Sequence, residues 1–339
     1  MPDVTDAPAA TPDCPTGRRI AKITIYPVKS CRGIDLDRCI LGKEGLELDR
    51  NWAIVSVSEG KVLDQRSCFK LCRIMTRFTA EALLLALSKS DAEECGVAEQ
   101  ISVPLAADAY IAAPKITVSD RVDNLWYGHP LAASSAGEAS AAWVTAVVSS
   151  WLGEKAAGPY ILARYDGGRR IVEMFGGEAK RLVRDEDTAA FHDGCPVHLV
   201  SEASVSWMLE RLHGCPFEVE RLRANIVVSG EDAAHGEELW QELGVGHEGA
   251  LRLRHLSCVP RCQILTVDPS TGEKEMSRAD PITGRRGLDP LSILVKQRPP
   301  IHEGGFKFKG CVGVFLALEG EPAEIRVGDL VDVTARREG

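Results

Sequence analysis

The sequence predicts an α+β protein that is mostly β, built from two barrel-like domains with a few helices. Its 339 residues suffice for about two domains at roughly 150 residues each. Segments typical of short strands outnumber segments typical of helices, and the two kinds do not alternate regularly. This pattern favours barrels over a doubly wound parallel sheet, in which strands and helices alternate.

The composition argues against several classes of function. The formal net charge is −9, which disfavours nucleic acid as the main partner because phosphate binding needs a basic face. No apolar run approaches the ~18–20 residues that a transmembrane helix needs. Residues 1–18 are rich in Pro, Ala and Asp and lack the features of signal and transit peptides, so we expect a disordered tail there. The expected location is therefore the cytoplasm.

The cysteines do not form a recognisable framework. There are 11 of them, scattered along the chain. An odd number without regular spacing is not typical of a disulfide-bonded protein, and a reduced, cytosolic protein is the better interpretation. Two close pairs, Cys68 with Cys72 and Cys258 with Cys262, leave a four-cysteine zinc site open, although neither has the usual two intervening residues.

The elements of the first half follow from the spacing of apolar residues. Expected strands cover residues 21–28, 51–57, 63–66, 71–79, 116–118 and 124–126. A tight loop is expected at 29–33, and a surface insertion at 88–100, which has no clear period. Residues 138–152 predict a helix, because Trp143, Trp151 and the apolar residues between them recur at helical spacing.

The second half begins in a glycine- and arginine-rich segment, 154–178, which we interpret as the crossing between domains. This gives an N-terminal domain of residues 19–155 and a C-terminal domain of residues 156–339. Expected strands cover 196–200, 226–228, 264–267, 313–318 and 325–333, and expected helices cover 201–212 and 289–297. Ser201 is a good N-cap for the first of these helices, because its hydroxyl can accept from a free backbone N–H.

The most informative stretch runs from His255 to Arg278 and reads HLSCVPRCQILTVDPSTGEKEMSR. Cys262 lies at the end of a loop, just before the apolar run, and directly follows Arg261. A neighbouring guanidinium favours the thiolate, so we expect a lowered pKa for the Cys262 thiol. A thiolate is a nucleophile and a soft metal ligand, suited to copper, zinc, iron–sulfur or molybdenum.

A group of residues suited to anions lies in the first half. Lys29 and Ser30 stand side by side in the expected tight loop, where a cation and a hydroxyl can hold a phosphate. Arg50 lies at the entry to the next expected strand. We expect it to turn inward beside Lys29, although a solvated turn charge is the plainer interpretation.

A second group lies in the C-terminal half. Arg223 and Asn225 alternate onto one face of the lead-in to the strand at 226–228. Arginine is a planar donor and asparagine both donates and accepts, which suits a phosphate or a polar heterocycle. Asp193, in the loop before the strand at 196–200, can reach the same site.

Four stretches together resemble the MOSC-domain family, the molybdenum cofactor sulfurase C-terminal superfamily, and within it the mitochondrial amidoxime reducing components. They are CVPRCQILTVDPSTG, YPVKSCRG, LDRNWAIV and SEAS. The resemblance covers about residues 19–335 and is weak from roughly 85 to 180. It implies a β-rich N-terminal domain packed on a MOSC β-barrel, with a cofactor between them. One departure is Ala224, which stands where the family has proline.

The resemblance also implies roles for individual residues. Cys262 matches the protein ligand to molybdenum and is thereby the predicted catalytic residue. The predicted cofactor-binding set is Lys29, Ser30, Arg50, Asp193, Arg223, Asn225, Arg261 and Cys262. Within it, the lysine, the serine and the first arginine match positions that contact the pterin phosphate. The second arginine and the asparagine match other contacts to the cofactor.

The implied function is reduction of N-hydroxylated substrates, such as amidoximes and hydroxylamines, with the molybdenum cofactor (Mo-molybdopterin). The sequence carries no flavin, haem or iron–sulfur signature, so the electrons must come from separate proteins. For the relatives these are a cytochrome b5 and its NADH-dependent reductase. The resemblance also allows association with mitochondria, although neither an anchor nor a transit peptide is seen.

Two other functions stay open at this point. The first is a binding or transfer module that carries molybdenum cofactor or sulfide on Cys262 without turning over an N-hydroxylated substrate. The second is a cysteine-dependent hydrolase that pairs Cys262 with a histidine such as His255, seven positions away and without special spacing.

Overall fold

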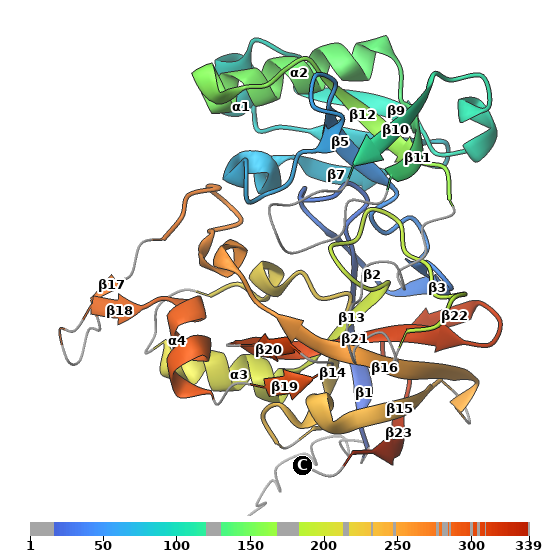
Figure 1. Cartoon of the computed structure of the whole chain (residues 1–339), viewed down its shortest axis with the longest axis vertical. Coiled ribbons are helices and arrows are strands. Elements are labelled where there is room, and N and C mark those ends of the chain that lie inside the picture. Colours follow the sequence, from blue (N-terminus) through green and yellow to red (C-terminus); the bar gives the residue numbers. More distant parts are fainter. Residues whose placement is uncertain are drawn as a thin grey trace, which may run out of the picture.

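The structure is a computed structural model that describes residues 17–119, 130–167, 183–212, 217–231, 233–246, 249–275, 278–279, 284, 286–298, 301–303, 306–308 and 310–337. Figure 1 shows two bodies, one above the other. The upper body is formed mainly by the first half of the chain, and the lower body mainly by the second half. The mostly β fold predicted from the sequence is confirmed.

The upper body contains a closed barrel of five strands. In order around the barrel they are β10 Lys115–Ser119, β11 Pro130–Ser135, β12 Tyr160–Tyr165, β5 Trp52–Ser56 and β6 Lys61–Val62. A three-stranded sheet lies beside it, formed by β7 Met75–Phe78, β8 Ala82–Ala86 and β9 Gln100–Pro104. Helices α1 Lys89–Cys95 and α2 Glu138–Leu152 cover the top (Figure 1). Trp143 and Val147 of α2 share a buried core with Leu83 and Leu85 of β8.

The lower body is an eight-stranded sheet in the order β2–β1–β14–β13–β21–β16–β15–β23. Its strands are β1 Arg19–Ile25, β2 Ile34–Leu36, β13 Val197–Ser201, β14 Ile226–Ser229, β15 Trp240–Val245, β16 Leu251–Pro260, β21 Cys311–Glu319 and β23 Val331–Arg336. Alternate side chains point to one face, where Trp240, Leu253 and Leu316 belong to a buried apolar core.

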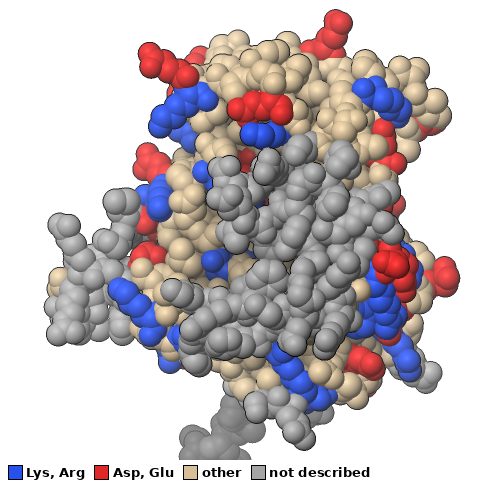
Figure 2. All heavy atoms as spheres, in the orientation of Figure 1, with Lys and Arg blue, Asp and Glu red and all other residues tan. Residues whose placement is uncertain are grey.

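A second core of the lower body contains helices α3 Glu202–Arg211 and α4 Pro290–Gln297. Met208 of α3 and Leu294 of α4 pack there with Val200 of β13 and Val312 of β21. Short strands complete the body: β3 Arg38–Gly42, β4 Gly45–Leu46, β17 Arg278–Ala279, β18 Arg286–Leu288, β19 Ile301–Glu303, β20 Phe306–Phe308 and β22 Ala323–Arg326. On the described part of the face in Figure 2, basic and acidic side chains are interspersed rather than gathered into one basic field.

The strands do not pair according to the predicted division at residues 155 and 156. β12, at Tyr160–Tyr165, closes the N-terminal barrel by pairing with β5 and β11. In the other direction β1 pairs with β14, and β3 pairs with β22, so N-terminal strands complete C-terminal sheets. Of the predicted tail, residues 1–16 lie outside the described part, and Arg18 forms an ion pair with Glu231 at 2.9 Å.

Several predicted elements are confirmed, including the helix at 138–152, the Ser201-capped helix and the strands at 51–57 and 226–228. The insertion at 88–100 instead contains α1, which Ser88 caps at its N-terminus and Gly96 ends in the left-handed conformation. The expected strand at 63–66 is wrong, because residues 64–67 form a turn around Asp64. The expected strand at 124–126 lies outside the described residues.

Candidate cofactor site

The cysteine loop differs from the prediction in its secondary structure. β16 ends at Pro260, and residues Gln263–Thr266 form a short 3-10 helix, η9, rather than the expected strand at 264–267. Cys262 is the N-cap residue of η9, and its carbonyl accepts from Leu265 N at 3.1 Å. The Cys262 side chain is half-buried. A helix start therefore presents this thiol at the end of the loop.

Arg261 is held by the backbone of a neighbouring turn. Its Nη2 donates to the carbonyls of Arg221 at 3.2 Å and Leu222 at 2.9 Å, both in the 3-10 helix η6 Val219–Leu222. Its Nε is buried without a hydrogen-bond partner. Burial outweighs the neighbouring Cys262 thiol and lowers the pKa of Arg261. Arg261 thus ties the cysteine loop to η6.

Lys29 and Asp193 form the second part of the site. Lys29 is buried, and its Nζ lies 2.6 Å from Asp193 Oδ1 and 2.8 Å from the Phe191 carbonyl, to which it donates. Arg66 reaches the same carboxylate at 3.4 Å and also binds Asp64. The Asp193 side chain is 50% exposed. Desolvation raises its pKa, but Lys29 and Arg66 outweigh this and hold the pKa below its usual range. Asp193 is therefore ionised between two cations.

Arg66 is the second cation beside Asp193. Burial lowers the pKa of Arg66, but Asp193, Asp64 and Cys262 together outweigh it and raise the pKa. The sequence prediction missed Arg66, which lay in the wrongly expected strand at 63–66. A turn signal was present there, because aspartate side chains favour turns by bonding the backbone two residues on, as Asp64 does to Arg66 N at 2.9 Å.

Asp49 is the centre of the third part of the site. It is buried, and it accepts from Tyr26 N at 2.6 Å, Arg50 Nη1 at 2.5 Å and Asn225 Nδ2 at 2.9 Å. His192 Nε2 lies 2.9 Å from its Oδ2. Asp49 and Arg50 are thus buried rather than solvated turn charges. The carboxylate fixes Arg50 and Asn225 in place.

Lys29 and Arg50 lie side by side, as expected of neighbouring strand ends. Lys29 N donates to the Trp52 carbonyl at 2.8 Å, and Arg50 N donates to the Tyr26 carbonyl at 2.9 Å. Phe191 joins the two, because its N–H donates to the Arg50 carbonyl at 3.0 Å while its own carbonyl accepts from Lys29. Ser30, next along the chain, accepts from Gln65 N at 2.9 Å.

Arg223 and Asn225 reach the same region in different ways. The Arg223 guanidinium lies over the Tyr26 ring at 4.2 Å and donates to the Cys31 carbonyl at 2.9 Å, whereas its Nη2 is buried without a partner. Arg50 lies over the same ring at 4.4 Å. Asn225 is occupied by the protein itself, since its Nδ2 donates to Asp49 and its Oδ1 accepts from His198 N. Asn225 therefore positions Asp49 and the β13 backbone.

Three predicted site residues adopt the left-handed backbone conformation that favours glycine. The φ angles are 71° at Ser30, 52° at Arg50 and 52° at Arg223. Non-glycine residues rarely adopt this conformation, and such strain tends to occur at functional sites. The fold thus maintains an unfavourable backbone at the residues that the sequence marked for an anion.

The donors of the site fit a phosphate-bearing metal cofactor. The cationic side chains are Lys29, Arg50, Arg66, Arg223 and Arg261, and the carboxylates among them are Asp49, Asp64 and Asp193. Five cations and three carboxylates leave two positive charges for an anion. Arg223 Nη2, Arg261 Nε and His198 Nε2 are buried without partners. Burial, Arg261 and Arg50 lower the pKa of His198, so this histidine, which the prediction missed, is neutral.

The zinc alternative gains no support. Among the residues that the structure describes, no group of three or more histidine, cysteine or acidic side chains is arranged to hold a metal ion. Cys258 Sγ lies 3.4 Å from Arg337 Nη2, and His255 lies within β16, where it pairs with Leu316.

In the described part of the chain no helix is both long and apolar enough to cross a membrane.

The lowered pKa of Asp49 in the folded protein predicts that the free energy of unfolding depends on pH. Burial raises its pKa, but Arg50 and His192 outweigh burial and lower the pKa to about 2, against about 3.9 in an unfolded chain. The stabilisation is complete above the unfolded pKa and is lost as pH falls through the folded pKa. We expect the free energy of unfolding to fall by about 2 kcal/mol from this group between about pH 4 and pH 2.

Urea unfolding at a series of pH values measures this effect. Asp49→Asn should be less stable at neutral pH and should lose this part of the acid dependence. Asp37→Asn, at an exposed aspartate, is the matched control and should keep the wild-type profile. An unchanged acid profile in a folded Asp49→Asn protein would contradict the assignment.

Known proteins match this chain over most of its length. The MOSC N-terminal beta barrel domain family matches residues 17–150, and the MOSC domain family matches residues 186–332. Mitochondrial amidoxime reducing component 2 of Rattus norvegicus is 30% identical over 324 residues, covering 92% of this chain and 82% of the rat protein. Mitochondrial amidoxime-reducing component 1 of Homo sapiens is 28% identical with the same coverage. Molybdenum cofactor sulfurase of Bos taurus is 25% identical, covering 79% of this chain and 29% of the bovine protein.

Proposed function

Since this chain belongs to the MOSC-domain family, we propose that it is a molybdenum-cofactor-dependent oxidoreductase that reduces N-hydroxylated compounds such as amidoximes and hydroxylamines. The observation that carries the proposal is the placement of Cys262 in the same region as a cluster of cations, of which Lys29 and Arg50 are buried. The thiol follows Arg261, whose guanidinium donates to the Leu222 carbonyl beside Arg223. Nearby, Arg66 shares the Asp193 carboxylate with Lys29. A soft metal ligand and a phosphate-binding cluster in one place suit a metal cofactor that carries a phosphate.

Different residues of the chain bind the metal and the phosphate of such a cofactor. Cys262, as the thiolate, supplies the protein ligand to molybdenum. Lys29, Arg50 and Arg223 neutralise the phosphate with charge-assisted hydrogen bonds, each worth about 1.5–3 kcal/mol. The bound cofactor supplies the two-electron chemistry that removes oxygen from nitrogen.

Other residues position these groups. Asp49 orients the Arg50 guanidinium and the Asn225 amide, and Asp193 orients Lys29 and Arg66. His198 is buried and neutral, so it adds no charge beside Arg50 and Arg261. The site therefore offers a fixed pattern of donors before the cofactor arrives, which lowers the free-energy cost of ordering on binding.

The electrons are proposed to come from separate proteins. We propose a cytochrome b5 and its NADH-dependent reductase, or an analogous pair, as the electron donor. The names of the amidoxime-reducing relatives support the reaction class, which consumes two electrons in each turnover. Turnover with a chemical reductant separates the reductase activity from the identity of the natural donor.

The test is reduction of benzamidoxime by cofactor-loaded protein, with product benzamidine measured by chromatography. Dithionite-reduced methyl viologen serves as the donor in one series, and cytochrome b5 with its reductase and NADH in another. The proposal predicts sustained turnover, many product molecules per chain, in the first series. At most one product molecule per bound cofactor would instead favour a carrier of molybdenum cofactor or sulfide.

A further inference from the structure

A hairpin that its own hydrogen bonds hold together follows Cys262 and runs from Thr266 to Glu275. Asp268 N donates to the Glu273 carbonyl at 2.9 Å, and Glu275 N donates to the Thr266 carbonyl at 2.8 Å. The short helix η9 connects the hairpin to Cys262, which is the N-cap residue of η9. A displacement of the hairpin therefore displaces the thiol as well.

The lower body holds both ends of this segment. Before the thiol, Arg261 Nη2 donates to the Leu222 carbonyl of η6 at 2.9 Å. After the hairpin, Arg221 of the same 3-10 helix binds Glu275 at 2.9 Å through a side chain with 0% exposure. These contacts fix the start and the end of the segment and leave the tip of the hairpin, residues 268–272, to other partners.

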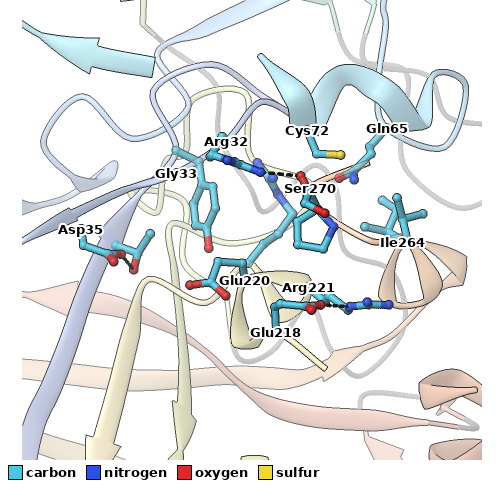
Figure 3. A pocket seen from close by; sticks show the side chains of 15 residues that line it. Arg32, Gly33, Asp35, Gln65, Cys72, Glu218, Glu220, Arg221, Ile264 and Ser270 are labelled. Atoms are coloured by element: carbon cyan, nitrogen blue, oxygen red, sulfur yellow. Dashed lines mark hydrogen bonds and ion pairs between the residues drawn. The ribbon is translucent and has the colours of Figure 1, made fainter. Parts of the chain in front are cut away.

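The tip of the hairpin is tied to the loop that carries Lys29. Arg32 Nη2 donates to the Pro269 carbonyl at 2.7 Å (Figure 3). The Arg32 backbone is itself fixed to the upper body, because its N–H donates to the Ile74 carbonyl at 3.0 Å and its carbonyl accepts from Thr76 Oγ1 at 2.8 Å. Arg32 thus joins the loop proposed to bind the phosphate to the hairpin that follows the thiol.

A second contact brings the tip against the backbone of the 3-10 helix η1 Phe69–Arg73. A Cβ atom added at Gly272 would lie 2.7 Å from Lys70 Cα, well inside van der Waals contact. The φ angle of Gly272 is 68°, which glycine adopts readily. A residue with a side chain at this position would push the tip away from η1.

The space beside these two contacts is not filled by packing. A cavity of about 340 Å³ lies next to the hairpin, and Arg32, Cys72, Pro269 and Ser270 are among the residues that line it (Figure 3). Close packing normally holds a buried segment in place, and a void gives it room to shift. The position of the tip therefore depends on the Arg32 hydrogen bond and on the backbone contact with η1.

We propose that Arg32 is a positioning residue for the Cys262 thiol. Its hydrogen bond to Pro269 fixes the hairpin, and through it the thiol, at a set distance from the loop that carries Lys29. The inference rests on the proposed function, because a metal ligand and a phosphate site serve one cofactor only at a fixed separation.

Alkylation by iodoacetamide of the full chain, produced without the cofactor, measures how firmly the thiol is held. Trypsin releases Cys262 in the peptide CQILTVDPSTGEK, and it releases Cys95, a half-buried thiol at the end of α1, in a different single-cysteine peptide. One digest thus reports both rates. Arg32→Ala should raise the rate at Cys262 about tenfold, since it removes a hydrogen bond from a charged group. The rate at Cys95 should not change.

Two further arginine variants make this test specific. Arg32→Lys keeps a cationic donor and should stay within about twofold of the wild-type rate at Cys262. Arg77→Ala removes an exposed arginine of β7 that binds Gln100 at 3.1 Å, and it should change neither rate. A rise at Cys95 equal to that at Cys262 in Arg32→Ala would show general loosening of the fold and would overturn the assignment.

A matched pair of glycine variants tests the hairpin independently of Arg32. Gly272 and Gly60 have similar φ angles, 68° and 62°, but nothing lies within 4 Å of a Cβ atom added at Gly60. Both alanine variants therefore carry the same backbone strain, and only Gly272→Ala also meets Lys70. Gly272→Ala should accelerate alkylation of Cys262 and Gly60→Ala should not. Equal rates in the two variants would contradict the role of the docked tip.

Cofactor-loaded protein separates this inference from the proposed function. Arg32→Ala should keep the wild-type pterin content, because Lys29 and Arg50 are unchanged, and should reduce benzamidoxime about tenfold more slowly. Arg32→Lys should restore the rate. Unchanged alkylation of Cys262 in Arg32→Ala would overturn the positioning role even if the wild type reduces benzamidoxime. Faster alkylation confined to Cys262 would support the role even if the wild type does not.

Discussion

Cys262→Ser should abolish reduction of benzamidoxime while the protein stays folded. A hydroxyl is a harder and far less acidic ligand than a thiol, so the variant offers molybdenum no thiolate. We expect the rate to fall by more than about a hundredfold, beyond the 10–100-fold typical of residues that only orient a metal ligand. Cys262 is half-buried in a loop and caps η9 through no side-chain hydrogen bond, so the fold should be unaffected.

Cys258→Ser is the matched control for this experiment. Cys258 is buried in β16, four positions before Cys262, with its sulfur 3.4 Å from Arg337 Nη2. A serine there keeps a hydrogen-bonding atom of similar size and should retain most of the activity. Equal losses in the two variants would mean that both thiols are needed, and unchanged activity in Cys262→Ser would reject Cys262 as the ligand.

Lys29→Ala and Arg50→Ala should each purify with much less molybdenum than the wild type. Both cations are buried and lie side by side, joined through Phe191. Removing one charged partner of a buried phosphate should lower its affinity by roughly a hundredfold. The double variant should lose less than the sum of the two, because the residues share one ligand.

Metal analysis on folded protein measures this effect, with circular dichroism as the check on folding. Arg38→Ala and Lys43→Ala are matched controls, because both side chains are exposed. They should keep the wild-type content. Arg50→Ala removes a partner of the fully buried Asp49, whereas Asp193, the partner of Lys29, is 50% exposed and keeps Arg66. Lys29→Ala is therefore the cleaner variant. Wild-type molybdenum content in both single variants would confine the cofactor site to the C-terminal half.

Local sequence patterns correctly predicted the elements that have a clear signal of their own, such as helical spacing of apolar residues or an N-cap residue. The helix at Glu138–Leu152 has apolar residues at helical spacing and a following glycine, and α3 begins where Ser201 caps it. The run Ile264–Val267 misled the prediction, because a short buried apolar segment suits a strand and a helical turn equally well. Its outcome was set by tertiary structure, since η9 packs against η6 and α4.

Site residues that belong to short sequence motifs could be predicted from the sequence. Site residues that only the folded chain brings together could not. Family motifs marked Lys29, Arg50 and Cys262, and the structure places the first two side by side. Asp49 and Arg66 carry no sequence signal for a site, because their importance depends on partners more than a hundred positions away. Long-range ion pairs and buried carboxylates of this kind follow from the packing of the two bodies and not from any local spacing.

The molybdenum content of the purified wild-type chain tests the central claim most directly. The protein would be produced in a host that synthesises molybdenum cofactor, and metal per chain would be measured by inductively coupled plasma mass spectrometry alongside the released pterin. We predict molybdenum and pterin in equal amounts, close to one of each per chain. A folded chain that carries neither molybdenum nor pterin after production in such a host would contradict the assignment of this site.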